Sequence, residues 1–213
     1  MAVALLIYAA LWLGFADDWG WIAAVDNETL RLFHEFGVTR PGWIAFWGGV
    51  SSVFGPTGMR FIAALGIGAA LLRRRLRTAA FVAVAVMLMG PLAAAAKALS
   101  DRPRPDTALV IASSTSFPSG HALGAMVGVL TFGTVLWPLM PARARPPAIV
   151  LGTLIVLTVG ISRVALNVHH PTDVVAGWAL GYLWFRCCFA LIPPLSRRSG
   201  SSGPQQVSRR SAS

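Results

Sequence analysis

The sequence predicts an all-α fold, a polytopic membrane helical bundle of about six transmembrane helices with an extra interfacial helix. Of its 213 residues, 55% are hydrophobic and only 12% are charged, which is too little polar surface for a soluble domain. The apolar residues gather in runs close to the ~20 residues that a helix needs to cross the hydrocarbon core of a bilayer. The charged residues collect between these runs, which is typical of a multi-pass membrane protein.

Six apolar runs are the expected spans. They cover residues 1–16, 57–72, 78–96, 121–137, 148–162 and 173–192. The first run is short enough to be the apolar region of a signal peptide. No lysine or arginine precedes it and no clear small-residue cleavage site follows it, so we expect a retained span.

A seventh apolar piece, residues 42–54, is shorter than a span. It carries Trp43 and Trp47 and stops at Gly55-Pro56. Tryptophan settles where hydrocarbon meets water, so this piece is expected to be the interfacial helix.

The net charge of +10 is explained by membrane topology. With six spans, the basic clusters all fall on one side, and the positive-inside rule makes that side cytoplasmic. Their members are Arg73, Arg74, Arg75, Arg77, Arg143, Arg145, Arg197, Arg198, Arg209 and Arg210. We therefore expect no nucleic-acid partner and a protein of the plasma membrane with two regions. These are an integral membrane domain over residues 1–192 and a basic, disordered cytoplasmic tail over residues 193–213.

The remaining polar residues lie in three loops on the opposite, outer face. They are Lys97, Arg104, Ser119, Gly120, His121, Arg163, His169 and Asp173. Arginine offers a planar fork of donors to phosphate oxygens, and lysine adds a point charge. Ser119 and Gly120 precede a helix, whose free N–H groups favour an anion. This composition predicts a phosphate site, whereas His34 and His170 are interpreted as polar interface residues.

Two histidines are expected to divide the chemistry. His169 and Asp173 are four residues apart, so the carboxylate can orient the ring and leave its other nitrogen free to attack phosphorus. His121 would then be the general acid that protonates the departing oxygen. A metal site made of His121, His169 and Asp173 is the chemical rival. The surrounding cations would repel a dication, so no metal and no cofactor is expected.

Glycines at a spacing of four mark two of the spans. They are Gly120, Gly124 and Gly128 on the fourth span, and Gly177 and Gly181 on the sixth. Small faces let membrane helices approach closely. We therefore expect these two helices to lie side by side.

The motifs also resemble those of a known family. Three motifs match the three-part signature of the type 2 phosphatidic acid phosphatase superfamily. The first is Lys97 with six residues to Arg104-Pro105, and the second is Pro118-Ser119-Gly120-His121. The third is Ser162-Arg163 with five residues to His169 and three more to Asp173. The resemblance implies a metal-independent lipid phosphatase with a phosphohistidine intermediate. It implies His169 as nucleophile, Asp173 as its partner and His121 as acid, with phosphate held by Lys97, Arg104, Ser119, Gly120 and Arg163. Vanadium haloperoxidases share the signature, but they are soluble.

The expected substrate is a lipid phosphate of the bilayer, with its tail left in the hydrocarbon. Candidates are a polyprenyl diphosphate, phosphatidylglycerophosphate and phosphatidic acid, and the arginine-rich, alanine-rich composition favours bacterial envelope lipids. Two alternatives stay open. The same intermediate would serve a lipid phosphotransferase, and a non-catalytic lipid-phosphate binding or transport protein would keep the cations without an oriented histidine.

Overall fold

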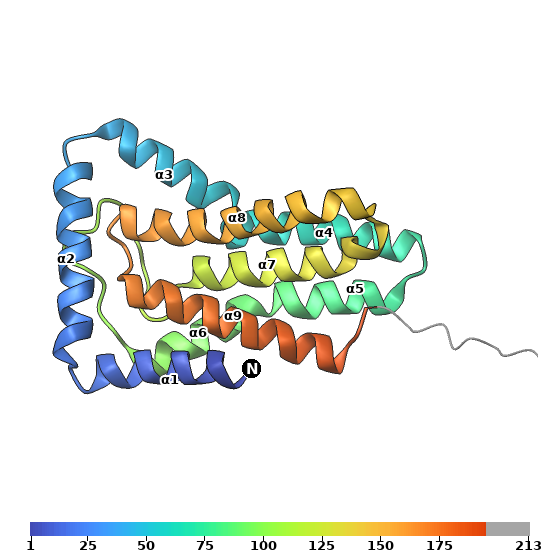
Figure 1. Ribbon diagram of the computed structural model, residues 1–213, viewed down its shortest axis with the longest axis horizontal. Coiled ribbons are helices and arrows are strands. Elements are labelled where there is room, and N and C mark those ends of the chain that lie inside the picture. Colours follow the sequence, from blue (N-terminus) through green and yellow to red (C-terminus); the bar gives the residue numbers. More distant parts are fainter. Residues whose placement is uncertain (195–213) are drawn as a thin grey trace, which may run out of the picture.

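The computed structural model describes residues 1–194, and these are helical apart from short turns and one long loop (Figure 1). The expected disordered tail, residues 193–213, lies outside the described part except for its first two residues. The helices are α1 (Ala2–Ala16), α2 (Gly20–Gly37), α3 (Pro41–Val53), α4 (Pro56–Leu72), α5 (Leu76–Val82), the π-helical η1 (Ala83–Met87), α6 (Met89–Ser100), α7 (Gly120–Leu136), the 3₁₀ turns η2 (Trp137–Leu139) and η3 (Ala142–Ala144), α8 (Arg145–Ala165) and α9 (Pro171–Leu191).

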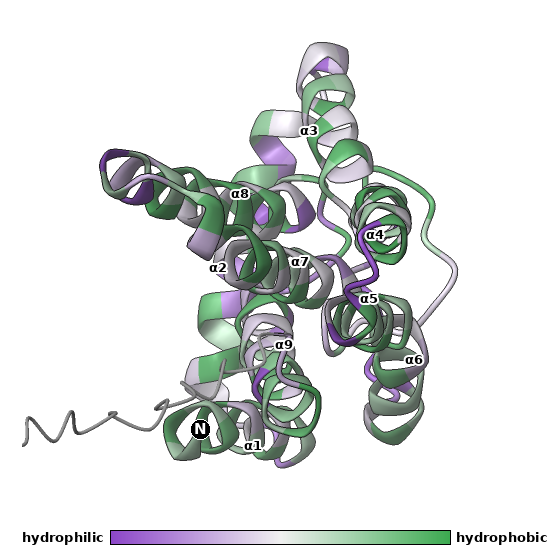
Figure 2. Cartoon of the chain, turned by 90° about the vertical axis from the view of Figure 1, so that its right-hand side faces the viewer, coloured by the Kyte–Doolittle hydropathy of each residue, from purple (hydrophilic) through white to green (hydrophobic). Residues whose placement is uncertain are grey.

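Five helical stretches of the described chain are long and apolar enough to cross a membrane, or six if the bent pair of α1 and α2 is one span. The expected spans that begin near residues 57, 78, 121, 148 and 173 fall within these five stretches. Figure 2 shows hydrophobic residues, in green, over much of the bundle. Many large apolar side chains are exposed on its outside. A surface of this kind is suited to lipid.

Proline begins several of the helices. Pro41, Pro56 and Pro171 each occupy the first helical position, where the missing N–H costs nothing and the fixed backbone angle suits the helix. Residues 42–54 form a helix as expected, namely α3. A short break separates it from α4, and the two together make one apolar stretch of 32 residues.

A π-helical segment, η1, lies inside the span from Leu76 to Ser100. The widened turn disturbs the regular helical hydrogen bonds at a depth where no water can replace them. The Trp184 indole of α9 donates a hydrogen bond to the Ala85 carbonyl across 2.9 Å. A neighbouring helix thus provides a hydrogen-bond donor to one carbonyl group of the widened turn.

The helix α2 was not predicted. It meets α1 at an angle of 90° and runs across one end of the bundle (Figure 1). Ile22, Asp26 and Leu30 recur at every fourth residue and form its buried face. Charged residues on its other face interrupt the apolar pattern, so no apolar run of span length marks this segment.

The glycine pattern correctly predicted that α7 and α9 are neighbours. A Cβ added at Gly177 would lie 2.5 Å from the Ser119 carbonyl oxygen, and one at Gly181 would lie 2.8 Å from that of Leu123. Only glycine lets the two backbones come this close. On α7 itself, Gly124 and Gly128 face methionines of the opposite side of the bundle.

The two ends of the bundle differ in composition. The turns that hold Arg73 to Arg75 and Arg143 to Arg145 lie at one end, together with the end of α9 (Figure 1). The loop of residues 101–119 and the turn of residues 166–170 lie at the other end, beneath α2. All three motif loops therefore converge, as the spans predicted.

Candidate active site

A pocket of about 480 Å³ opens where the three motif loops converge. Six of the eight residues predicted from the sequence line it, and α3 and the 110–114 segment complete its wall. The six are Lys97, Arg104, Gly120, His121, Arg163 and His169.

His169 is held between a carboxylate and a guanidinium. Its ring is buried, with Nδ1 3.5 Å from Asp173 Oδ2 and Nε2 3.3 Å from a nitrogen of Arg104. A guanidinium can only donate, so Nε2 accepts and the ring proton is assigned to Nδ1, facing Asp173. The Nε2 lone pair therefore points toward the pocket side of the ring.

Burial keeps the His169 ring neutral. The pKa of His169 is lowered to about 3, chiefly by loss of hydration and also by the Arg163 and Arg104 charges, while Asp173 acts in the opposite direction. At neutral pH the ring is therefore an uncharged base, and its one lone pair lies on Nε2, beside Arg104.

Asp173 lies in the first turn of α9, where it forms a capping box with His170. Its Oδ2 accepts from the His170 N–H across 2.8 Å and lies 3.1 Å from His170 Nδ1. The Ser116 hydroxyl donates to the same oxygen. Its Oδ1 accepts from Arg102 across 2.7 Å. His170, expected at the interface only, is thus a direct partner of the carboxylate.

Three cations line the pocket without a carboxylate partner among the described residues. Lys97 donates to the Thr115 and Ser116 carbonyls, Arg104 to the Ser114 and Val168 carbonyls, and Arg163 to the Ser51 hydroxyl. Neutral oxygens position these side chains but leave their charge uncompensated. The pocket is therefore suited to an anion.

Burial also lowers the pKa of Arg104, the lining cation that touches His169. Arginine starts from so high a pKa that it remains protonated in proteins. Arg104 thus keeps its charge beside the neutral ring.

The start of α7 supplies the other side of the pocket. Ser119 caps the helix by accepting from the Ala122 N–H at 3.5 Å, and it is fully buried. Gly120 lines the pocket, and the nearest protein atom to a Cβ added there is the Ala93 Cβ at 3.9 Å. His121 packs against Gly55, where an added Cβ would lie 2.8 Å from the ring.

Three residues around Asp173 were missed by the sequence analysis: Ser116, Arg102 and Asp26. Arg102 was counted among the six intervening residues between Lys97 and Arg104. Its position in Arg102-Pro103-Arg104-Pro105 is the signal that could have drawn attention to it. Asp26 offered no signal, because its approach depends on the unpredicted helix α2.

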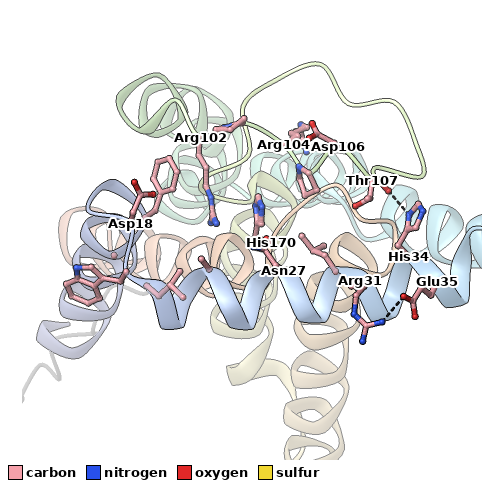
Figure 3. Close-up of a pocket in the computed structure, with 18 residues that line it drawn as sticks. Asp18, Asn27, Arg31, His34, Glu35, Arg102, Arg104, Asp106, Thr107 and His170 are labelled. Atoms are coloured by element: carbon pink, nitrogen blue, oxygen red, sulfur yellow. Dashed lines mark hydrogen bonds and ion pairs between the residues drawn. The ribbon is translucent and has the colours of Figure 1, made fainter.

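A second pocket, of about 550 Å³, lies between α1, α2 and the 102–107 segment (Figure 3). Arg104 lines both pockets, and His170 lines this one. His169, His121 and Lys97 do not line it. The candidate chemistry therefore belongs to the smaller pocket.

Within residues 1–194, no group of three histidine, cysteine, aspartate or glutamate side chains has an arrangement that could hold a metal ion. His121, His169 and Asp173, the rival ligand set, do not form such a group. The described donor set around the pocket consists mainly of cations and hydroxyl groups, which are ligands for an oxyanion rather than a dication.

Comparison with known proteins shows the family of this chain. The model of the PAP2 superfamily matches residues 76–197, more than half of the chain. A phosphatidylglycerophosphatase B of Bacillus subtilis is 45% identical over 89 residues, covering 40% of this chain and 43% of that protein. A decaprenylphosphoryl-5-phosphoribose phosphatase of Mycobacterium tuberculosis is 31% identical over 149 residues, covering 68% of this chain and 77% of that protein.

The fold has a solved counterpart. The crystal structure of a transmembrane PAP2-type phosphatidylglycerolphosphate phosphatase from Bacillus subtilis superposes with a TM-score of 0.68 at 26% identity, covering 91% of this chain and 99% of that one. The chain therefore belongs to the PAP2 superfamily and is an integral, multi-pass membrane phosphatase of that family.

Proposed function

We propose that the chain hydrolyses the phosphomonoester or diphosphate of a membrane lipid through a covalent phosphohistidine at His169, without a metal ion. One observation carries the proposal: a buried, neutral His169 contacts Asp173 on one side and faces a pocket of uncompensated cations on the other. A nucleophile needs a free lone pair and an oriented ring, and the phosphate needs positive charge around it.

In the first step, His169 Nε2 attacks phosphorus. The N–P bond forms as the P–O bond to the lipid breaks, and His121 donates a proton to the departing oxygen. The ring keeps its Nδ1 proton and becomes cationic, and the Asp173 carboxylate stabilises that charge. Lys97, Arg104 and Arg163 stabilise the charge that develops on the phosphoryl oxygens.

In the second step, water attacks phosphorus. His121, now neutral, takes a proton from the water as the new P–O bond forms. The N–P bond breaks, its electron pair returns to His169 Nε2, and inorganic phosphate leaves. The neutral His169 is then restored, and His121, beside the bound phosphate anion, again carries the proton that it donated in the first step.

The position of the pocket supports a lipid substrate. It opens at the end of an apolar bundle, where a phosphate headgroup meets water while its tail remains in hydrocarbon. Relatives act, by their names, on phosphatidylglycerophosphate and on a decaprenyl phosphoribose lipid. We propose phosphatidylglycerophosphate, a polyprenyl diphosphate or phosphatidic acid as substrates, with the pocket on the outer face.

Release of inorganic phosphate from these lipids by the purified protein in detergent tests the proposal. His169→Ala is expected to abolish turnover, and His121→Ala to lower kcat by about 10²- to 10⁴-fold. His34→Ala is the matched control and should retain activity, because His34 of α2 is only partly buried and does not line the pocket of His169. Activity that survives in His169→Ala would exclude the phosphohistidine.

The same assay separates the alternatives. EDTA should leave the rate unchanged, and loss of activity with the chelator would restore the metal site. Label that appears on an added alcohol instead of in inorganic phosphate would indicate a phosphotransferase. Lipid binding without turnover would indicate a binding or transport protein.

A further inference from the structure

A buried chain of three charges joins α2 to α9 behind the His169 ring. Arg102 lies between two carboxylates: one guanidinium nitrogen is 2.8 Å from Asp26 Oδ2 and another is 2.7 Å from Asp173 Oδ1. All three side chains are buried, and Arg102 also stacks over the Phe15 ring of α1 at 4.9 Å. Figure 3 shows Arg102 extending from its loop toward α2.

We infer that Arg102 and Asp26 are a positioning pair that sets the orientation and the charge of Asp173, and through Asp173 those of the His169 ring. The inference rests on the proposed function, because it concerns the group that would orient the nucleophile. Neither residue lines the pocket that holds His169. Both therefore act through Asp173 rather than on the substrate.

The division of the Asp173 oxygens gives the first reason. Arg102 is bonded to Oδ1, while Oδ2 is left to Ser116, His170 and His169. A fixed bond to Oδ1 prevents the carboxylate from rotating. The Oδ2 atom then keeps the position from which it meets the Nδ1 proton of His169.

The charge balance gives the second reason. Arg102 alone would cancel the charge of Asp173, and a neutral pair would stabilise a cationic phosphohistidine ring poorly. Asp26 adds a second negative charge, so the three side chains carry a net charge of −1. The carboxylate that meets His169 is thus held firmly without being neutralised.

Asp26 is itself bound to the first turn of α9. Its carboxylate accepts from the Thr172 N–H across 3.1 Å and from the Thr172 hydroxyl across 2.6 Å. A negative charge is favourable at a helix N-terminus, so Asp26 also anchors the turn that carries Asp173. The helix α2 is thereby coupled to the catalytic carboxylate.

Asp26→Asn is the sharpest single test, because it keeps the size and one acceptor and removes the charge. We expect kcat to fall by about 10- to 100-fold, while KM and the inhibition constant of inorganic phosphate stay within about threefold. The phosphate-binding cations are untouched, so only the step that needs the oriented ring is slowed. Arg31→Gln, on the exposed face of the same helix, is the control and should keep wild-type kcat.

A double-mutant cycle tests whether Arg102 acts through Asp173. Asp173→Asn and Arg102→Gln should each lower kcat strongly, and the double variant should be no slower than Asp173→Asn alone. If the fold-losses in kcat of the two single variants multiply in the double variant, the inference is overturned. Equal rises in KM and in the inhibition constant of inorganic phosphate would also overturn it. If Arg102→Gln does not fold, Arg102→Lys is tested in its place. Its kcat should lie below that of the wild type but above that of Asp173→Asn.

His169→Ala separates a failure of the proposed phosphohistidine from a failure of the positioning pair. An active His169→Ala protein would remove the proposed function and the inference with it. An inactive His169→Ala protein together with wild-type kcat in Asp26→Asn would overturn the positioning pair alone.

Discussion

At the scale of single residues, the charge state of His169 has a measurable effect on stability. Its pKa is lowered by burial to about 3 in the folded protein, against about 6.5 for an unfolded histidine. Below pH 6.5 the unfolded chain binds a proton that the folded chain does not. The stability contributed by the neutral ring is therefore complete above about pH 6.5 and declines as the pH falls toward 3.

His169→Gln removes this dependence, because glutamine does not titrate. We expect the melting temperature of the wild type in detergent to fall more than that of His169→Gln when the pH is lowered from 7 to 4. His34→Gln, changed at a histidine that is only partly buried, should follow the wild type. Parallel curves for the wild type and His169→Gln would contradict a neutral, buried ring.

The site residues illustrate what sequence spacing can and cannot indicate. The separation of His169 and Asp173 by four residues predicted their contact, because both lie at the start of one helix. Arg102 and Asp26 could not be predicted in the same way. Their contact joins positions 76 residues apart, and it depends on the angle at which α2 crosses the bundle.

At the scale of helices, the closeness of α7 and α9 depends on glycine. Gly177→Ala would bring a methyl group to 2.5 Å from the Ser119 carbonyl, next to the start of α7. We expect a loss of about 1–3 kcal/mol in unfolding free energy and reduced turnover, because α7 and α9 both carry pocket residues. Thermal unfolding and phosphate release in the same detergent would measure both effects.

Gly66→Ala on α4 is the matched control. Among residues 1–194, no atom outside the local helix lies within 4 Å of a Cβ added there. Alanine is a better helix former than glycine, so this variant should be as stable as the wild type or slightly more stable. Equal stability of the two alanine variants would show that the contact between α7 and α9 is less strict than the structure indicates.

The helices themselves were predicted to different degrees. Long apolar runs marked α4 and the helices from α5 to α9, since a span must bury its backbone hydrogen bonds in hydrocarbon. The helix α2 has only a narrow apolar face, and charges interrupt its sequence. Its helical form is stabilised by the bundle end that it covers, which local sequence does not show.

At the scale of the whole molecule, the two ends of the bundle predict how the protein is inserted. Arginine-rich turns lie at the end away from the pocket, so we expect that end in the cytoplasm and the pocket outside. Single cysteines in a Cys187→Ala, Cys188→Ala background would report this. Ala108→Cys should react with a membrane-impermeant maleimide in intact cells, and Arg74→Cys should react only after permeabilisation.

The opposite labelling pattern would place the pocket in the cytoplasm and would limit the substrates to lipids of the inner leaflet. Both positions are exposed, and neither lines a pocket described above. Labelling of both sites in permeabilised cells is the control for reactivity.

The three buried charged residues, Asp26, Arg102 and Asp173, are also synthesised in a fixed order. A ribosome makes Asp26 first, then Arg102, and Asp173 only with the last helix. When Arg102 enters the growing bundle, its first partner is already present, so the arginine need not wait unpaired for α9. His169 and Asp173 are made close together near the end of synthesis. The order of synthesis therefore makes Asp26 available to neutralise Arg102 before Asp173 has been made.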